Sequence, residues 1–124
     1  MSFGSINDDV IASWLSALAG QCRFASVHYA KPTWTDPSAS EVTDAGYTRQ
    51  PVLLDIESER GIVLGAPLTF GPLAPMTVSA IGLWTDLHAG IMQVFCEAPP
   101  GNSLYIATSK TVVIPLGELA IRLP

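Results

Sequence analysis

Two histidines are the side chains best suited to acid–base chemistry in this sequence. His28 lies in a predicted strand and His88 in a predicted hairpin turn, and neither belongs to a local ligand or triad pattern. A Ser-His-Asp triad assembles from positions far apart in a chain, so the sequence leaves that arrangement open. No Gly-x-Ser-x-Gly step, the motif that exposes a nucleophilic serine, accompanies them. We therefore expect structural or exposed histidines, no catalytic residues and no enzymatic activity.

Oxygen ligands and one tryptophan gather in a loop predicted at residues 32–46. The carboxylates of Asp36, Glu41 and Asp44 could together hold Ca²⁺, which prefers several oxygen ligands. Their spacing is not that of an EF-hand, and we expect solvated acids, no metal site and no cofactor. Trp34 could stack on a sugar, insert into a neighbour's pocket or anchor the loop to its own domain. Trp34 and Asp36 are therefore the candidate sugar-binding residues.

Charged side chains are scarce in this chain of 124 residues. They make up 14% of it, with six Lys and Arg, eleven Asp and Glu and a net charge of −5; an ordinary soluble domain carries about 25%. The cations are scattered singly, whereas a nucleic-acid binder needs clustered cations to displace counterions from phosphates, so we expect no nucleic-acid partner. Sparse charge is expected where neighbouring subunits cover much of the surface, and it favours a homo-oligomer.

The longest uncharged stretch, residues 61–85, is long enough to span a membrane. Pro67, Pro72 and Pro75 break any helix there, and a lone β-stretch cannot satisfy its backbone in lipid, so we expect no membrane partner. The N-terminal residues carry aspartates where a secretory signal needs positive charge, and we expect no export.

Two cysteines, Cys22 and Cys96, fit no metal spacing. They could pair only if the fold brings them together, and without export we expect two reduced thiols.

The sequence predicts one helix at residues 6–20. Asn7 is placed to cap it, and Ile6 and Ile11 have the spacing of a hydrophobic staple. Apolar residues then recur at steps of three and four, which gives one apolar face, and Gly20 is a natural stop; the face comprises Val10, Ile11, Trp14, Leu15 and Leu18.

The remaining residues, 24–124, read as about seven or eight short strands between Gly and Pro turns. No room is left for crossover helices, so the sheets must be largely antiparallel. We expect one domain over residues 1–124, mainly β, built as an antiparallel, jelly-roll-like β-sandwich or as a barrel. The predicted strands cover 24–30, 52–57, 62–64, 68–70, 77–84, 91–96, 111–114 and 119–123.

Several short motifs occur in a fixed order along the chain and together span most of it. They are Val27-His28-Tyr29, Asp36-Pro37, Glu41-Val42, Gly46-Tyr47-Thr48-Arg49-Gln50, Val78-Ser79-Ala80-Ile81-Gly82-Leu83-Trp84 and Gly117-Glu118-Leu119-Ala120-Ile121-Arg122-Leu123. In this order they resemble a family of small tailed-phage virion proteins, often labelled tail fibre protein or minor structural protein. The chain departs from that family in the apolar hairpin at 62–73, where the family has a Gly-rich polar one, and we expect another subunit to bury this hairpin.

Some motif residues also have a plain physical interpretation. We expect Gly46 to adopt a positive φ and Gly82 to mark a bulge or the close approach of another backbone. In a chain with so few charges, Arg49 is expected to pair specifically with Asp44, Glu41 or a carboxylate of another chain. Trp84 closes an apolar strand and is expected in or near the core.

The resemblance implies a non-enzymatic structural protein of a bacteriophage virion, assembled in the host cytoplasm. We expect it to be a capsid decoration or minor capsid protein, with the major capsid protein or tail proteins as partners. The alternative is a component of the tail tip, baseplate or tail fibre that binds carbohydrate for host attachment. The candidate interface residues are Trp14, Trp34, Tyr47, Arg49, Leu68, Phe70, Leu73 and Met76, and we expect other subunits to cover the outer face of the helix, residues 61–85 and residues 98–109.

Overall fold

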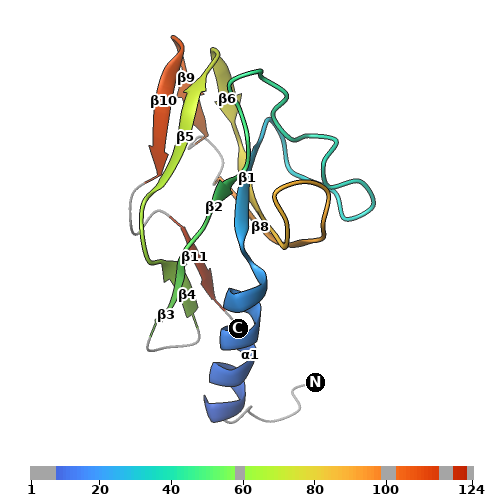
Figure 1. Ribbon diagram of the computed structural model, residues 1–124, viewed down its shortest axis with the longest axis vertical. Helices are drawn as coiled ribbons and strands as arrows, with labels where there is room; N and C mark the ends of the chain where they lie inside the picture. The colour runs from blue at the N-terminus through green and yellow to red at the C-terminus, as the bar shows by residue number, and fades with distance from the viewer. Residues whose placement is uncertain (1–7, 58–60, 99–102, 115–118, 123–124) are drawn as a thin grey trace.

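The structure is a computed structural model that describes residues 8–57, 61–98, 103–114 and 119–122. Within these residues, the regular structure consists of one helix and eleven short strands (Figure 1). In chain order these elements are α1 (Asp8–Gln21), β1 (Phe24–His28), β2 (Gln50–Pro51), β3 (Leu54–Glu57), β4 (Gly61–Leu64), β5 (Leu68–Leu73), β6 (Met76–Val78), β7 (Ala80–Trp84), β8 (Met92–Glu97), β9 (Leu104–Ile106), β10 (Lys110–Ile114) and β11 (Ala120–Arg122).

The strands pair antiparallel throughout and form four hydrogen-bonded sheets. The central sheet has the order β2-β1-β7-β8; the others are β11-β4-β3, β10-β5 and β6-β9. The predicted mainly β, antiparallel class with one N-terminal helix is confirmed.

The described residues hold more strands than the seven or eight expected from the sequence. The predicted strand at 77–84 divides into β6 and β7 where the chain changes partners, since β6 pairs with β9 whereas β7 pairs with β1 and β8. Ser79 already bonds to the partners of β7: its N–H donates to the His28 carbonyl, and its carbonyl accepts from the N–H of Ala98. β9 was not predicted, since its three residues hold no alternating pattern long enough to read.

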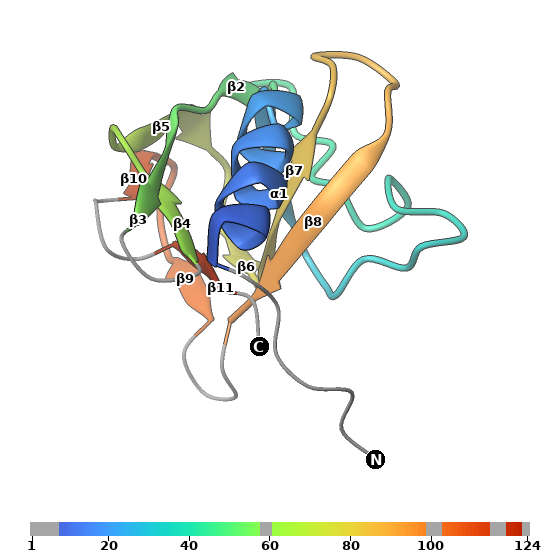
Figure 2. The same cartoon turned by 90° about the horizontal axis from the view of Figure 1, so that it is seen from below.

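Helix α1 packs against the sheet β11-β4-β3 and leads into β1 of the central sheet (Figure 1, Figure 2). Ile11 and Leu15 are buried against Ile62 of β4. The apolar face predicted for the helix is narrower than expected, because Val10 and Trp14 remain exposed. The helix ends one residue beyond the predicted stop, and the predicted cap and staple at residues 6 and 7 lie outside the described residues.

The apolar stretch at 62–73 fills much of the main hydrophobic core, but the predicted hairpin is wrong, because β4 pairs with β3 and β11 whereas β5 pairs with β10. Leu68, Phe70 and Leu73 are among its least exposed side chains, and Met76 packs against them half-buried. These positions were expected to contact another subunit, and the structure corrects that expectation. The low charge of the stretch 61–85 reflects burial beneath the chain's own sheets.

Gly46 also differs from the expectation, since its φ is not positive. A Cβ at this position would collide with the carbonyl oxygen of Pro72 in β5, so close backbone approach is what glycine permits here.

The connections between predicted strands at residues 58–60, 99–102 and 115–118 lie outside the described residues, as does the end of the predicted strand at 119–123. Within the described part of the chain, no helix is long and apolar enough to cross a membrane.

Candidate functional site

The central sheet has one apolar and one polar face. Because side chains alternate along a strand, Ala25 and Val27 of β1 enter the core while Ser26 and His28 point to the opposite face. On the neighbouring strand, Gly82 pairs with Ser26 and so lies on the same polar face. Residues 29–49 fold across this face and bury it.

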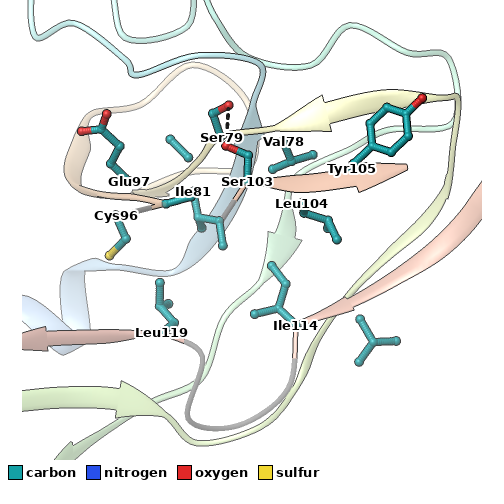
Figure 3. A pocket seen from close by; sticks show the side chains of 13 residues that line it. Val78, Ser79, Ile81, Cys96, Glu97, Ser103, Leu104, Tyr105, Ile114 and Leu119 are labelled. Atoms are coloured by element: carbon teal, nitrogen blue, oxygen red, sulfur yellow. Dashed lines mark hydrogen bonds between the residues drawn. The ribbon is translucent and has the colours of Figure 1, made fainter. Parts of the chain in front are cut away.

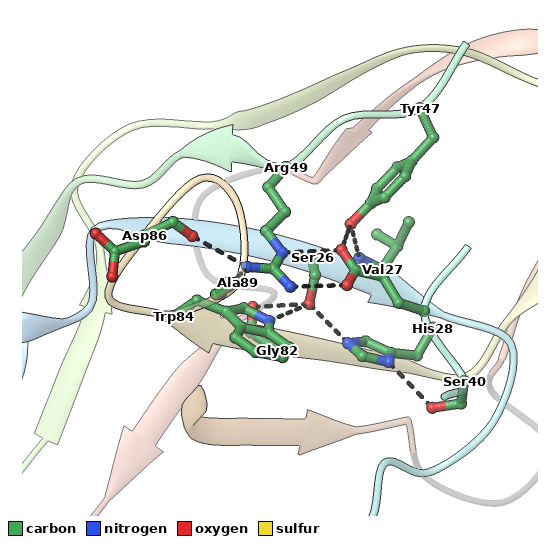
Figure 4. A network of polar contacts seen from close by, with 11 residues as sticks. Ser26, Val27, His28, Ser40, Tyr47, Arg49, Gly82, Trp84, Asp86 and Ala89 are labelled. Carbon is green, nitrogen blue, oxygen red and sulfur yellow. Dashed lines mark hydrogen bonds and ion pairs between the residues drawn. The ribbon is translucent and has the colours of Figure 1, made fainter. Parts of the chain in front are cut away.

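We call the buried group on this face the polar layer; it comprises Ser26, His28, Ser40, Glu41, Tyr47, Arg49 and Trp84 (Figure 4).

Ser26 and His28 form the tightest contact of the polar layer, with Oγ and Nε2 2.6 Å apart. Trp84 Nε1 donates to the same Oγ at 2.7 Å, and the Gly82 carbonyl lies 3.5 Å from it. The donor in the Ser26–His28 contact depends on the imidazole tautomer, and so does the direction of the 3.1 Å hydrogen bond between His28 Nδ1 and Ser40 Oγ.

This serine–histidine pair resembles the first half of a catalytic triad, but its surroundings differ in two ways. Both side chains are 0% exposed, so no substrate atom reaches the hydroxyl. The Nδ1 partner is the hydroxyl of Ser40, whereas a triad places a carboxylate there. Burial lowers the pKa of His28 to about 4, with the nearby Arg49 charge acting in the same direction and Glu41 opposing it. The imidazole is therefore neutral at pH 7 and acts as a buried hydrogen-bonding group.

Glycine at position 82 makes room for this group. A Cβ there would lie 2.6 Å from Ser26 Oγ and 3.0 Å from both His28 Nε2 and Trp84 Nε1. The prediction that another backbone approaches Gly82 closely is wrong, because the nearest atoms belong to the side chains of Ser26, His28 and Trp84. The ladder irregularity also occurs nearby, between Leu83 and Trp84.

Arg49 is the charged centre of the polar layer and is 7% exposed. Its Nε and Nη2 each donate to the Glu41 carboxylate at 2.9 Å, in a bidentate pair. Its Nη1 donates to the carbonyls of Asp86 at 3.1 Å and Ala89 at 2.7 Å. The guanidinium lies 3.6 Å from the centre of the Trp84 ring, in cation–π contact. Of the partners that the sequence left open for Arg49, the structure selects Glu41.

Tyr47 completes the charged centre. Its hydroxyl donates to Glu41 Oε2 at 2.5 Å, and its ring stacks on Phe70 with centres 6.1 Å apart. Burial and the hydrogen bond to Glu41 raise the pKa of Tyr47 well above its usual range. Burial disfavours the ionised form of Glu41, but hydrogen bonds from Arg49 and Tyr47 outweigh it and lower the pKa of the carboxyl.

The polar layer fixes two exposed segments in place. Ser40 and Glu41 hold the end of the loop at 29–41, with Glu41 bridged to His28 and the N–H of Tyr29 donating to the Ser40 carbonyl. Arg49 holds the β7–β8 turn through two carbonyls, including that of Ala89, whose φ of 52° is unusual for a residue other than glycine. The layer therefore stabilises loop geometry, and any ligand must meet the loops and not the layer.

Trp34 is 62% exposed at the outer part of this loop. Its ring lies against Phe95 of β8, with centres 5.2 Å apart and planes tilted by 46°. Lys31 Nζ stands 6.0 Å from the centre of the same Phe95 ring. We call Trp34, Phe95 and Lys31 the aromatic platform.

An apolar groove of about 730 Å³ lies at another part of the molecule (Figure 3). Leu104, Tyr105, Val113 and Ile114 line one side of it and Ile81 and Cys96 the other. Tyr105 also lines the groove and is 69% exposed, and its ring points away from Leu104 and Ile114 (Figure 3).

The predicted site residues thus occupy three different environments. Tyr47 and Arg49 are inside the polar layer, Leu68, Phe70 and Leu73 are in the core, and Trp14, Trp34 and Asp36 are exposed. The structure brings none of the exposed ones together with the others. Within the loop, Asp36 is exposed as expected.

The three loop carboxylates do not gather around a cation. Glu41 is engaged by Arg49, and Asp44 Oδ2 accepts from the N–H of Ala74 at 2.8 Å. Across the residues that the structure describes, no group of three His, Cys, Asp or Glu side chains is placed to hold a metal. His88 is exposed in the β7–β8 turn.

Cys22 and Cys96 are free thiols that pack against the same core. Burial raises the pKa of Cys22 to about 11, with a smaller contribution from Cys96, and burial also raises the pKa of Cys96.

Sequence reasoning missed Ser26, Ser40 and the role of Trp84 as a donor. Ser26 and Trp84 are 58 positions apart and meet only through the register of β1 and β7. The one signal was a serine and a histidine at alternate positions of an otherwise apolar strand, which indicates a polar group that needs buried partners.

No family model, curated protein or solved structure matches this chain in comparisons of its sequence and fold.

Proposed function

We propose that this chain is a non-enzymatic structural protein of a tailed-phage virion that decorates the capsid by binding the major capsid protein. The ordered motifs that resemble small virion proteins supply the biological setting, and the exposed surface supplies the physical argument. Eleven large apolar side chains are at least 37% exposed among the described residues. The whole chain has six Lys and Arg with which to solvate that surface. Apolar, charge-poor surface is the composition of lasting protein interfaces.

The observation that carries this proposal is the apolar groove. Leu104, Ile114 and Ile81 come together at it from three strands (Figure 3). The exposed residues Tyr105 and Val113 also line it. A groove of this size accepts several apolar side chains of a partner, and burying such area stabilises a contact by about 25 cal/mol per Å². We assign it to contact with the capsid lattice.

The polar layer supports a structural role in a second way. The Ser26–His28 pair and the Glu41–Arg49 pair are both used inside the chain to hold the loops on the central sheet. A rigid domain loses little conformational entropy when it joins an assembly, which favours tight attachment.

A position in the tail is the alternative to capsid decoration. The tail tip, baseplate or fibre would use the same apolar surfaces, so location must be measured directly. We would label the chain in purified particles of the phage that encodes it and image them by electron microscopy. Label distributed over the shell supports decoration, label at the tail supports the alternative, and absence of the chain from particles refutes both.

Binding to shells provides the quantitative test. Shells assembled without this chain should bind the purified protein, and Val113→Asp should weaken binding by about tenfold or more, since one buried charge without a partner costs well over 1.4 kcal/mol. Leu53→Asp is the matched control, because Leu53 is 59% exposed against 55% for Val113 and does not line the groove. Equal binding by wild type and Val113→Asp would remove the groove from the proposal.

A further inference from the structure

We propose that the aromatic platform of Trp34, Phe95 and Lys31 is a saccharide-binding site that stacks the apolar face of a pyranose ring. This inference is independent of the groove and of the location of the chain in a virion. The loop at 29–41 would then bind a saccharide through Trp34, and the polar layer would hold this loop in place.

Trp34 has the exposure of a binding residue. A tryptophan that anchors a loop buries its ring, as Trp84 does in this same chain at 2% exposed. Trp34 is 62% exposed and uses only part of its ring against Phe95. The two ring planes are tilted by 46°, and more than half of the Trp34 side chain stays in contact with solvent. Aromatic faces carry partial negative charge, so they attract the C–H groups on the apolar face of a sugar ring.

The loop presents Trp34 in a fixed position. Thr33 Oγ1 accepts from the N–H of Asp36 at 3.3 Å, and the Asp36 carbonyl accepts from the N–H of Ala39 at 3.2 Å. The end of the loop is held by Ser40 and Glu41 in the polar layer. A ring that is already held in place loses little entropy on binding, and this favours weak ligands such as single sugar rings.

Polar groups suited to sugar hydroxyls surround the rings. The Lys31 ammonium, 6.0 Å from the Phe95 ring centre, can donate to a hydroxyl or to an acidic substituent. Thr33, Thr35 and Asp36 are exposed in the same loop and supply further donors and acceptors. An apolar plane with donors and acceptors close to it is the combination that sugars require, because one face of a pyranose is apolar and its edge is hydroxylated.

Binding is tested on a glycan array of bacterial surface saccharides, then by titration calorimetry with cellohexaose and chitohexaose as neutral probes and an oligogalacturonate as an acidic one. We expect at least one probe to bind with a dissociation constant of millimolar or tighter. Trp34→Ala should weaken that binding about tenfold, which corresponds to about 1.4 kcal/mol. Lys31→Ala should weaken the acidic probe more than a neutral one if the ammonium meets an acidic group.

Trp14→Ala is the matched control. Trp14 is 53% exposed on α1, and no aromatic ring is in contact with it among the described pairs. It should bind the probes as wild type does. The indole N–H resonance of Trp34 in the wild-type protein gives a readout that needs no variant, since it should shift on titration.

Absence of binding to every array saccharide and probe at millimolar concentration would overturn the proposal. Equal binding by wild type and Trp34→Ala, or an unshifted Trp34 resonance with a bound probe, would do the same. None of these results bears on the shell-binding experiment, so the two proposals fail separately.

Discussion

Replacing Arg49 by alanine should destabilise the fold strongly. The change removes both hydrogen bonds to the Glu41 carboxylate, both hydrogen bonds to the carbonyls of Asp86 and Ala89, and the cation–π contact with Trp84. It leaves a carboxylate in a site that is mostly shielded from water. Breaking a buried ion pair by removing one partner costs about 3–5 kcal/mol. A domain of this size has a total stability of about 5–15 kcal/mol, so the loss is a large part of it.

Thermal and urea unfolding measure this loss. We expect Tm to fall by about 10–20 °C, with an unchanged denaturant slope if both states stay equally compact. Arg23→Ala is the matched control, because Arg23 is an exposed cation whose guanidinium lies 6.0 Å from the centre of one aromatic ring, that of Phe24. It should change stability by less than about 0.5 kcal/mol.

A double-mutant cycle separates the charge pair from the rest. Glu41→Gln combined with Arg49→Met should cost less than the sum of the two single changes, because the double variant leaves no buried charge. If Arg49→Ala lowers stability by less than about 1 kcal/mol, or if the two single changes add, then the pair does not hold the polar layer together and the reasoning fails.

Three further outcomes follow from the same structure. The pKa of His28 is about 4 in the folded state and near 6.5 in the unfolded state, so the free energy of unfolding should fall by about 3 kcal/mol as the pH drops from 6.5 to 4. Urea unfolding at several pH values should show this fall. His28→Gln should remove most of the pH dependence between 6.5 and 4. Gly82→Ala should destabilise the folded protein by about 1–3 kcal/mol, because the new Cβ would collide with side chains of the polar layer. Gly20→Ala is the control: nothing lies within 4 Å of its new Cβ, and calorimetry should show an unchanged stability or a gain of up to about 1 kcal/mol. At pH 8, a thiol reagent should barely modify Cys22 in the native protein and should modify Cys96 slowly, whereas in urea it should modify both cysteines immediately. Fast reaction of Cys22 in the native protein would contradict its burial.

The local elements of the fold could be predicted from the sequence where the pattern is local. The β7–β8 hairpin and α1 follow from turn residues and apolar spacing within one segment, and both are present. The sequence also indicated that Arg49 has a specific partner, since a buried cation needs one. Which of the carboxylates it meets depends on how the chain folds back over β1, and no local pattern encodes that.

The apolar stretch 61–85 shows why the surface was harder to predict. A run without charges indicates burial, but it does not say whether the same chain or another one provides the cover. The structure gives the answer through pairing within the chain: Phe70 pairs with Val112 and Leu68 with Ile114, so the partner strand of β5 comes from 40 or more positions away. The expectation of a covering subunit moves from this stretch to the groove and to the exposed face of α1.

The polar layer changes what the low charge of the chain means. If the charges of Glu41 and Arg49 had been on the surface, they would have solvated it; the fold uses both inside, where they hold a loop and a turn. The exposed surface is therefore poorer in charge than the composition indicates. The two segments that the polar layer fixes carry exposed apolar side chains, Trp34 in the loop and Ile91 after the β7–β8 turn. A chain selected only for solubility gains nothing from ordering such segments, because ordering costs conformational entropy. Ordered loops with exposed apolar side chains are useful when those side chains meet a partner, and this is the physical ground on which the loop that carries Trp34 is proposed for recognition.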